Sequence, residues 1–441
     1  MISLSSRCVC LARRARFRGA SFALLMAAAL VPTHAALALT LDDALRLAQD
    51  RSRQLPAQDA AAYASHQLAA AAGRRPDPTL KAGINNLPVD GPDRFSLTRD
   101  FMTMRSVGVM QELTRGSKLE ARSARFEREA ELAEASRQLA LANLQRDTAI
   151  AWLARHYQER MAEVLASQRD EAKLQIEAAD AAYRGGKGSQ SDVLAARSAV
   201  ALTEDRIAQV ERQIATAKIQ LARWIGTPAG EPLSPLPSLA SVNFHPDDLE
   251  ALVERHPEIA VLRKREEMAR ADVELARADK KPDVSVELMY SQRGPAYSNM
   301  ASINFSIPLQ WDQKSRQDRE VAAKLALLDQ RRAEREEAGR MHIAEDLAMW
   351  QEWQSNRDRL ARYDSSLVPL ALERTRASIA AYRGATASLS AVLESRRVEI
   401  DTRLERLRLE MDTARLWAQL NYLIPPTRDA ADPLAEQKRA P

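Results

Sequence analysis

The stretch Ala182-Tyr183-Arg184-Gly185 recurs 199 positions later as Ala381-Tyr382-Arg383-Gly384, and this repetition decides how the whole chain is organised. Other similar segments follow in the same order at nearly the same spacing. They are Trp152 with Trp350, Gln220-Leu221 with Gln419-Leu420, Asp192-Val193-Leu194 with Ala391-Val392-Leu393, and Arg75-Pro76-Asp77 with Lys281-Pro282-Asp283. An ordered series of matches across both halves indicates a tandem duplication.

The duplication divides the chain into predicted domains. We expect a secretory leader at 1–38, a first structural repeat at 39–227 and a second repeat at 245–425. A linker at 228–244 separates the repeats, and a flexible tail is expected at 426–441. The linker is marked by four prolines, Pro228, Pro232, Pro235 and Pro237.

Each repeat is predicted to end in a long helical hairpin. The arms are Ser117 to Tyr183 and Asp192 to Ile225 in the first repeat, and Ser315 to Tyr382 and Leu389 to Leu423 in the second. At 1.5 Å per residue such arms are about 50 to 100 Å long, which no single globular core needs. Pro369 should kink or break the third arm. In the last arm of each repeat, mainly apolar residues recur every seven positions, as in coiled-coil seams. In the second repeat the two interleaved series are Leu393, Ile400, Leu407 and Ala414, and Leu404, Met411 and Ala418. In the first repeat they are Val200, Ile207, Ile214 and Leu221, and Thr203, Val210, Ala217 and Trp224.

A short helix and two strands precede each hairpin in the predicted order. The short helices are expected at Leu41 to Gly73 and at Pro246 to Asp279. Alternation of apolar and polar residues is clearest in the second repeat, where Ile303, Phe305, Ile307 and Leu309 alternate with Ser302, Asn304, Ser306 and Pro308. The four predicted strands are Leu80 to Asn86, Ser106 to Leu113, Val284 to Tyr290 and Ser302 to Leu309. Strands of about ten residues suit a tilted bilayer crossing, and because four cannot close a barrel, three chains with twelve strands are expected.

The first 38 residues have the features of an export signal. Five arginines precede an apolar core at 22–31, and Ala36-Leu37-Ala38 offers a cleavage site. Both cysteines, Cys8 and Cys10, lie in this segment, so we expect a mature chain without disulfides, thiolate metal sites or a lipid anchor. Removing the leader lowers Lys+Arg from 64 to 59 against 60 Asp+Glu, and the net charge of +4 becomes −1. The basic character therefore does not indicate a nucleic-acid partner.

The leader, the duplicated halves and the Tyr-Arg-Gly hairpin tips resemble the TolC-like outer-membrane factors of tripartite efflux pumps. This resemblance implies a mainly α-helical fold with a membrane β-barrel: a homotrimer whose twelve strands lie in outer-membrane lipid and whose helices form a periplasmic α-barrel. It also implies two partners, a periplasmic adaptor (membrane fusion protein) and an inner-membrane transporter of the proton-driven RND type. Four segments are similar to the heavy-metal (cobalt-zinc-cadmium and copper) branch: 75–78, 85–88, 101–104 and 111–113.

The resemblance also implies functional residues near the hairpin tips. Six tip residues are expected to contact the adaptor: Tyr183, Arg184, Gly185, Tyr382, Arg383 and Gly384. Glu394 matches a pore-constriction carboxylate, and Asp192 is the second predicted constriction residue; a neighbouring family aspartate is replaced by Ala391. Two simpler alternatives are that the tip glycines only permit a tight turn and that Glu394 is a solvated surface residue.

No catalytic, phosphate-binding or metal-binding motif occurs in the sequence, so we predict a non-enzyme without cofactors or bound metal. The resemblance implies a passive exit duct for heavy-metal cations. None of the five mature histidines, His66, His156, His245, His256 and His342, belongs to a recognisable ligand motif, and His245 and His256 are expected at the surface. Two alternatives remain open at this point. One is the same channel exporting drugs or proteins, and the other is a soluble periplasmic coiled-coil scaffold or adaptor.

Overall fold

The computed structural model describes residues 38–242 and 249–424. The predicted leader up to Leu37, His245 and the predicted tail lie outside the described residues. Among the residues that are described, no helix combines the length and the apolar character needed to cross a membrane.

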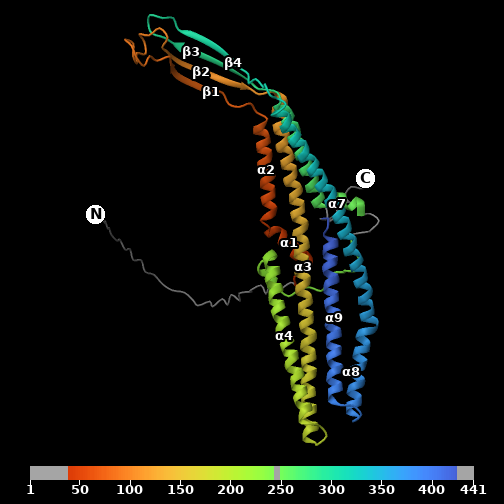
Figure 1. Ribbon diagram of the computed structural model, residues 1–441. Coiled ribbons are helices and arrows are strands. Elements are labelled where there is room, and N and C mark those ends of the chain that lie inside the picture. The colour runs from red at the N-terminus through yellow and green to blue at the C-terminus, as the bar shows by residue number, and fades with distance from the viewer. Residues whose placement is uncertain (1–37, 243–248, 425–441) are drawn as a thin grey trace, which may run out of the picture. The chain divides into compact units, whose positions relative to one another are not determined.

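The two halves of the chain contain the same order of elements (Figure 1). The first half consists of α1 (Leu41–Arg51), α2 (Gln54–Ala72), β1 (Thr79–Asn85), β2 (Met104–Leu113), α3 (Gly116–Arg184) and α4 (Gln190–Ile225). After the short 3-10 helix η1 (Thr227–Gly230), the second half consists of α5 (Leu249–Arg255), α6 (Pro257–Asp279), β3 (Val284–Gln292), β4 (Met300–Ser306), α7 (Gln317–Arg362), the π-turn η3 (Tyr363–Leu367), α8 (Val368–Arg383) and α9 (Leu389–Asn421).

The short helix that begins each half is interrupted, which corrects the prediction of one continuous helix. Ser52 has a non-helical backbone (φ −58°, ψ 130°) between α1 and α2, and its hydroxyl accepts a hydrogen bond from the Leu55 amide at 3.4 Å. His256 has an extended backbone between α5 and α6, because the following Pro257 disfavours the helical conformation of the residue before it. Both helices therefore restart after one or two residues.

The four predicted strands form one antiparallel sheet in the order β1-β2-β3-β4 (Figure 1). β2 pairs with β3, so the central pair joins the two halves of the chain. β4 ends at Ser306 and not at the predicted Leu309, because Pro308 has no amide hydrogen to donate to a neighbouring strand.

The long helix α3 is the centre of the helical region. Its first part packs against α2 and α6, and α6 packs against α7. Its second part packs against α4 and α9, and α9 packs against α8 (Figure 1). The predicted seam residues Leu221, Ile400, Leu404, Leu407, Ala414 and Ala418 are buried in this region.

The linker is fastened to the middle of α3. The Trp152 indole donates a hydrogen bond to the Leu39 carbonyl at 3.2 Å, and Leu39 forms a parallel bridge with Leu233. Arg155, which is buried, donates to the carbonyls of Ala229 and Glu231 at 2.8 and 2.7 Å. These bonds satisfy polar groups that would otherwise be buried without partners.

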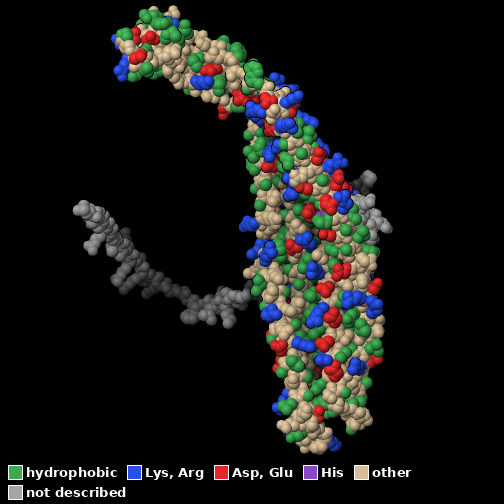
Figure 2. Space-filling model, viewed as in Figure 1, with side chains coloured by type: hydrophobic (Ala, Val, Ile, Leu, Met, Phe, Trp, Pro, Cys, Tyr) green, Lys and Arg blue, Asp and Glu red, His purple; other side chains and the backbone are tan. Residues whose placement is uncertain are grey.

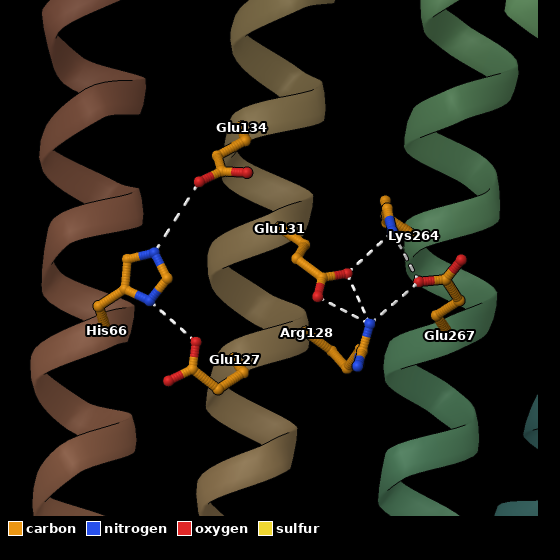
Figure 3. Close-up of polar contacts among 7 residues, drawn as sticks. All are labelled: His66, Glu127, Arg128, Glu131, Glu134, Lys264 and Glu267. Atoms are coloured by element: carbon orange, nitrogen blue, oxygen red, sulfur yellow. Dashed lines mark hydrogen bonds and ion pairs between the residues drawn. The ribbon is translucent and has the colours of Figure 1, made fainter.

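Ion pairs connect α2, α3 and α6 (Figure 3). Lys264 on α6 contacts Glu131 on α3 and Glu267 on α6, each at 2.8 Å. His66 on α2 lies between two carboxylates of α3, with Glu127 at 2.9 Å from Nδ1 and Glu134 at 3.8 Å from Nε2. Charged groups therefore contribute to the contact between the first-half helices and α6.

The predicted break at Pro369 occurs as a widened helical turn. The π-turn η3 lies directly before Val368 and Pro369, which are the first residues of α8. A proline ring clashes with the carbonyl four residues earlier, and a π-turn is one way in which a helix accommodates this.

Candidate functional site

The two hairpin tips have the same hydrogen-bonding pattern. In the first tip the amides of Gly185, Gly186 and Lys187 donate to the carbonyls of Ala181, Tyr183 and Ala182. In the second tip Gly384, Ala385 and Thr386 donate in the same way to Ala380, Tyr382 and Ala381. The repeated Ala-Tyr-Arg-Gly sequence thus encodes one turn twice.

Positive φ angles identify which tip residue needs conformational freedom. Gly186 has φ +69° and Ala385 has φ +58°, whereas the predicted turn residues Gly185 and Gly384 have φ −79°. The left-handed conformation costs a residue with a Cβ atom about 1 kcal/mol, so Ala385 is the more strained of the two. In the first tip the left-handed residue is Gly186, one of the predicted turn glycines, and in the second tip it is Ala385, which follows the predicted Gly384.

The tips pack against each other through one apolar cluster. Ala179, Val193 and Ala196 from the first hairpin are buried together with Leu389 and Val392 from the second. Tyr382 is partly buried against this cluster, but Tyr183 is exposed. Arg184 pairs with Asp180, and Arg383 is exposed. The repeat therefore presents different side chains at its two tips.

Asp192 and Glu394 lie just beyond the turns, on the returning helices. Asp192 forms a capping box, because its carboxylate accepts hydrogen bonds from the Ser189 amide at 3.0 Å and the Ser189 hydroxyl at 2.7 Å. These hydrogen bonds hold the pKa of Asp192 below its ordinary value. Glu394 is about half exposed and contacts Arg397 at 3.0 Å. Ala391 occupies the position equivalent to Asp192, so α9 has only the Ser388 cap.

The sheet reverses the usual arrangement of apolar and polar side chains. One row across all four strands consists of Leu80, Val109, Leu288 and Ile303, which lie directly opposite one another and are all exposed. On the other face Ser106 and Ser291 are buried and their hydroxyls lie 3.1 Å apart. Apolar side chains thus occupy one exposed face of the sheet, and polar side chains, some of them buried, occupy the other.

The polar face of the sheet has paired charges and one indispensable glycine. Lys81 on β1 contacts Glu287 on β3 at 3.0 Å across β2. Gly108 lies between these strands, and a Cβ atom there would be 2.7 Å from the Leu288 carbonyl oxygen. A glycine at this position therefore permits the close approach of β2 and β3.

The outer helices expose apolar side chains without a covering partner among the described residues. Tyr63 and Leu68 are exposed on α2, and Leu194, Leu202 and Ile219 on α4; Leu325, Leu327, Met341 and Leu347 are exposed on α7, and Leu370 on α8. Figure 2 shows hydrophobic side chains intermixed with charged ones along the helices. The chain therefore has exposed apolar groups on helices at both margins of the helical layer.

The structure corrects the predicted surface position of His256. Its ring lies 4.3 Å from that of His342, centroid to centroid, at the N-terminus of α6. Burial, then the nearby His342 and Arg146, lowers the pKa of His256 to about 4. Burial raises the pKa of Asp346, one helical turn after His342, to about 6. The sequence could not reveal this cluster because His256 and His342 are far apart along the chain.

Comparisons with known proteins agree with this architecture. The model of a family described as outer membrane efflux protein matches residues 44–227. The sequence has no match among curated proteins. Among solved structures, the chain is similar to the outer membrane protein VceC of Vibrio cholerae, with a TM-score of 0.72, 19% identity, and coverage of 87% of this chain and 95% of that chain.

Two further channels have similar structures. The CmeC outer membrane channel of Campylobacter jejuni has a TM-score of 0.73 at 11% identity and covers 90% of this chain and 89% of its own. CusC, which is described in connection with transmembrane channel formation, has a TM-score of 0.71 at 15% identity, over 87% of this chain and 91% of its own. The chain therefore has the fold of these outer-membrane channels.

Proposed function

We propose that this protein is the outer-membrane channel of a tripartite efflux system and acts as a passive duct without catalytic chemistry. The observation that carries the proposal is the reversed sheet, whose exposed apolar face suits lipid and whose polar face suits an aqueous lumen. The family match over residues 44–227 supports the same function. A soluble scaffold would leave this apolar face in water, which is unfavourable.

The active form in this proposal is a trimer. β1 and β4 are the edges of the sheet, and each has unpaired backbone groups on one side. A sheet in lipid satisfies all of its backbone groups only when it closes into a barrel, so β4 of one copy pairs with β1 of the next, and three copies supply twelve strands. The exposed apolar residues of α2 and α4 then meet those of α7 and α8 in a neighbouring copy.

The hairpin tips form the periplasmic end of the duct in this proposal. Exposed Tyr183, Arg184 and Arg383 offer an aromatic ring and guanidinium groups to the adaptor, together with Gly185, Gly384 and the more buried Tyr382. Glu394 and Asp192 line the constriction just inside the tips. The adaptor and the inner-membrane RND transporter supply the driving force, since the channel has no energy source of its own.

For cargo we infer heavy-metal cations, because the four segments at 75–78, 85–88, 101–104 and 111–113 resemble that branch. The cargo is tested in a strain from which this gene has been deleted. Growth on plates with zinc, cobalt, copper or hydrophobic drugs is compared between cells that carry the gene on a vector and cells that carry the empty vector. Rescue on metals and none on drugs is expected. Rescue on drugs alone would favour the drug-exporting alternative.

The channel itself is tested by mass and conductance. The mature protein, extracted in detergent, should have the mass of three chains and should produce discrete current steps in planar bilayers. A monomer that is released from membranes by salt and conducts no current would instead support the soluble scaffold.

A further inference from the structure

Residues of α3, α6 and α7 and the end of α9 line a cleft of about 230 Å³. His256 begins α6, His342 and Asp346 lie on α7, and Tyr422 follows α9; all four line the cleft. One ligand atom each from His256, Glu258 and His342 lies within 4.8 Å of the other two. Among the described residues, no other three histidine, cysteine, aspartate or glutamate side chains bring ligand atoms within 4.8 Å of one another.

The spacing is close to that of a metal site. Ligand atoms at about 2.0 to 2.2 Å from a tetrahedral metal ion are about 3.4 Å apart. His342 Nε2 already lies 3.2 Å from Glu258 Oε2. Glu258 is about half exposed, so its side chain is free to close the remaining gap to His256.

One buried polar atom in the cleft, Nε2 of His342, has no hydrogen-bond partner among the described residues. His342 is 9% exposed, and its Nε2 atom forms no hydrogen bond, although Glu258 Oε2 lies 3.2 Å away. Asp346 is 3% exposed, and no described residue donates a hydrogen bond to it or forms an ion pair with it. Because Asp346 lies four residues after His342, both project from one face of α7. An unpaired buried nitrogen is costly, and a cation bound between His342 and the two nearby carboxyl side chains would compensate for it.

We propose that His256, His342 and Glu258 bind a divalent transition-metal ion. Asp346 lines the same cleft and adds a negative charge beside the three ligands. Imidazole nitrogens with carboxylate oxygens are a donor set that suits Zn²⁺ and Co²⁺, whereas Ca²⁺ and Mg²⁺ prefer oxygen alone. Arg146 also lines the cleft and carries a positive charge. Its guanidinium forms an ion pair with Asp147 at 2.9 Å. The bound ion clamps the first turn of α6 to α7. This inference goes beyond the proposed channel function and does not depend on it.

The test measures Co²⁺ and Zn²⁺ binding to the full mature chain in detergent, after chelator treatment and removal of any affinity tag. We expect one Co²⁺ per chain with visible d–d absorption, displacement of Co²⁺ by Zn²⁺, and a higher melting temperature with Zn²⁺. The His256→Gln/His342→Gln variant should bind more than about 100-fold more weakly, since loss of outer-shell partners alone costs about 10- to 100-fold.

His66→Gln is the matched control. Glu127 and Glu134 approach opposite nitrogens of the His66 ring, so these three side chains cannot chelate one ion, and binding should be unchanged (Figure 3). Absence of binding by the wild-type protein, or undiminished affinity in the double variant, overturns the proposal. If the double variant does not assemble, the isosteric variants Glu258→Gln and Asp346→Asn decide. Both should lose affinity at least about 10-fold, and full affinity in both overturns the proposal. Conductance recorded from the same preparations reports the channel function separately.

Discussion

Leu288 on β3 lies directly opposite Ile303 on β4, and the two side chains are 59% and 64% exposed. Their sequence neighbours Glu287 and Asn304 form the next pair of the register, on the other face of the sheet. Two adjacent positions on one strand therefore face two different environments, and this allows the membrane proposal to be tested with a single type of substitution.

Ile303→Arg should prevent insertion into the outer membrane. An arginine on the lipid-facing side of a barrel costs about 2 to 4 kcal/mol at the bilayer midplane, and a trimer carries three copies of it. Heat-resistant trimer in the outer-membrane fraction is the measurement. Asn304→Arg is the control, because its guanidinium would lie beside Glu287 on the polar face and insertion should persist. Equal insertion of both variants would contradict the assignment of the faces.

Ile219→Asp should weaken the trimer without unfolding the protomer. Ile219 on α4 is 72% exposed, and burying an isoleucine against a neighbouring copy contributes about 1.5 to 3 kcal/mol. Native mass measurements across a detergent dilution series should show earlier dissociation, while circular dichroism keeps its helical signal. Ile219→Leu retains the apolar surface and should behave like the wild type. If Ile219→Asp leaves the dissociation unchanged, this part of α4 lies outside the interface.

Glu394→Ala should change single-channel conductance or cation preference without altering assembly. Three like charges in a narrow lumen attract cations, and added salt screens this effect. Glu405→Ala is a closely matched control, since both glutamates are 49% exposed on α9 and both contact an arginine three residues later. Recordings at low salt that are identical for wild type and Glu394→Ala would identify Glu394 as an ordinary surface residue.

Asp192→Ala should loosen the first turn of α4, and its effect should depend on pH. Because the folded-state pKa of Asp192 is lowered, the stabilisation is complete above the ordinary value of 3.8 and is lost as the pH falls through the folded-state pKa. A carboxylate near a helix N-terminus contributes about 0.3 to 1 kcal/mol. Hydrogen exchange in 190–194 should be faster in the variant at neutral pH, and the difference should vanish in strong acid.

The reciprocal change, Ala391→Asp, serves as the comparison for this prediction. It should complete the capping box with Ser388 and slow the exchange at the start of α9. If neither substitution changes exchange near its own tip, the cap bonds have no measurable effect on the hairpins.

The sequence alone predicted the order and type of the main elements, but not the helix breaks at Ser52 and His256. Alternation in 302–306 and the seven-residue spacing on α9 report local geometry, because a strand repeats every two residues and a coiled-coil helix every seven. Pro369 interrupts its helix for an equally local reason, the missing amide hydrogen and the ring clash. The repeated Ala-Tyr-Arg-Gly sequence encodes the same turn at both tips, since its hydrogen bonds join residues at most six apart.

Only the tertiary structure decided which of these local features meet. His256 approaches His342 because α6 packs against α7, and Tyr382 is partly buried while Tyr183 is exposed because the two tips pack asymmetrically. The charged contact of Lys81 with Glu287 depends on the strand order, which places β3 beside β2. These contacts join segments that are distant along the chain. A sequence pattern that spans a few residues shows which residue types are present, but it does not predict which distant residues contact one another.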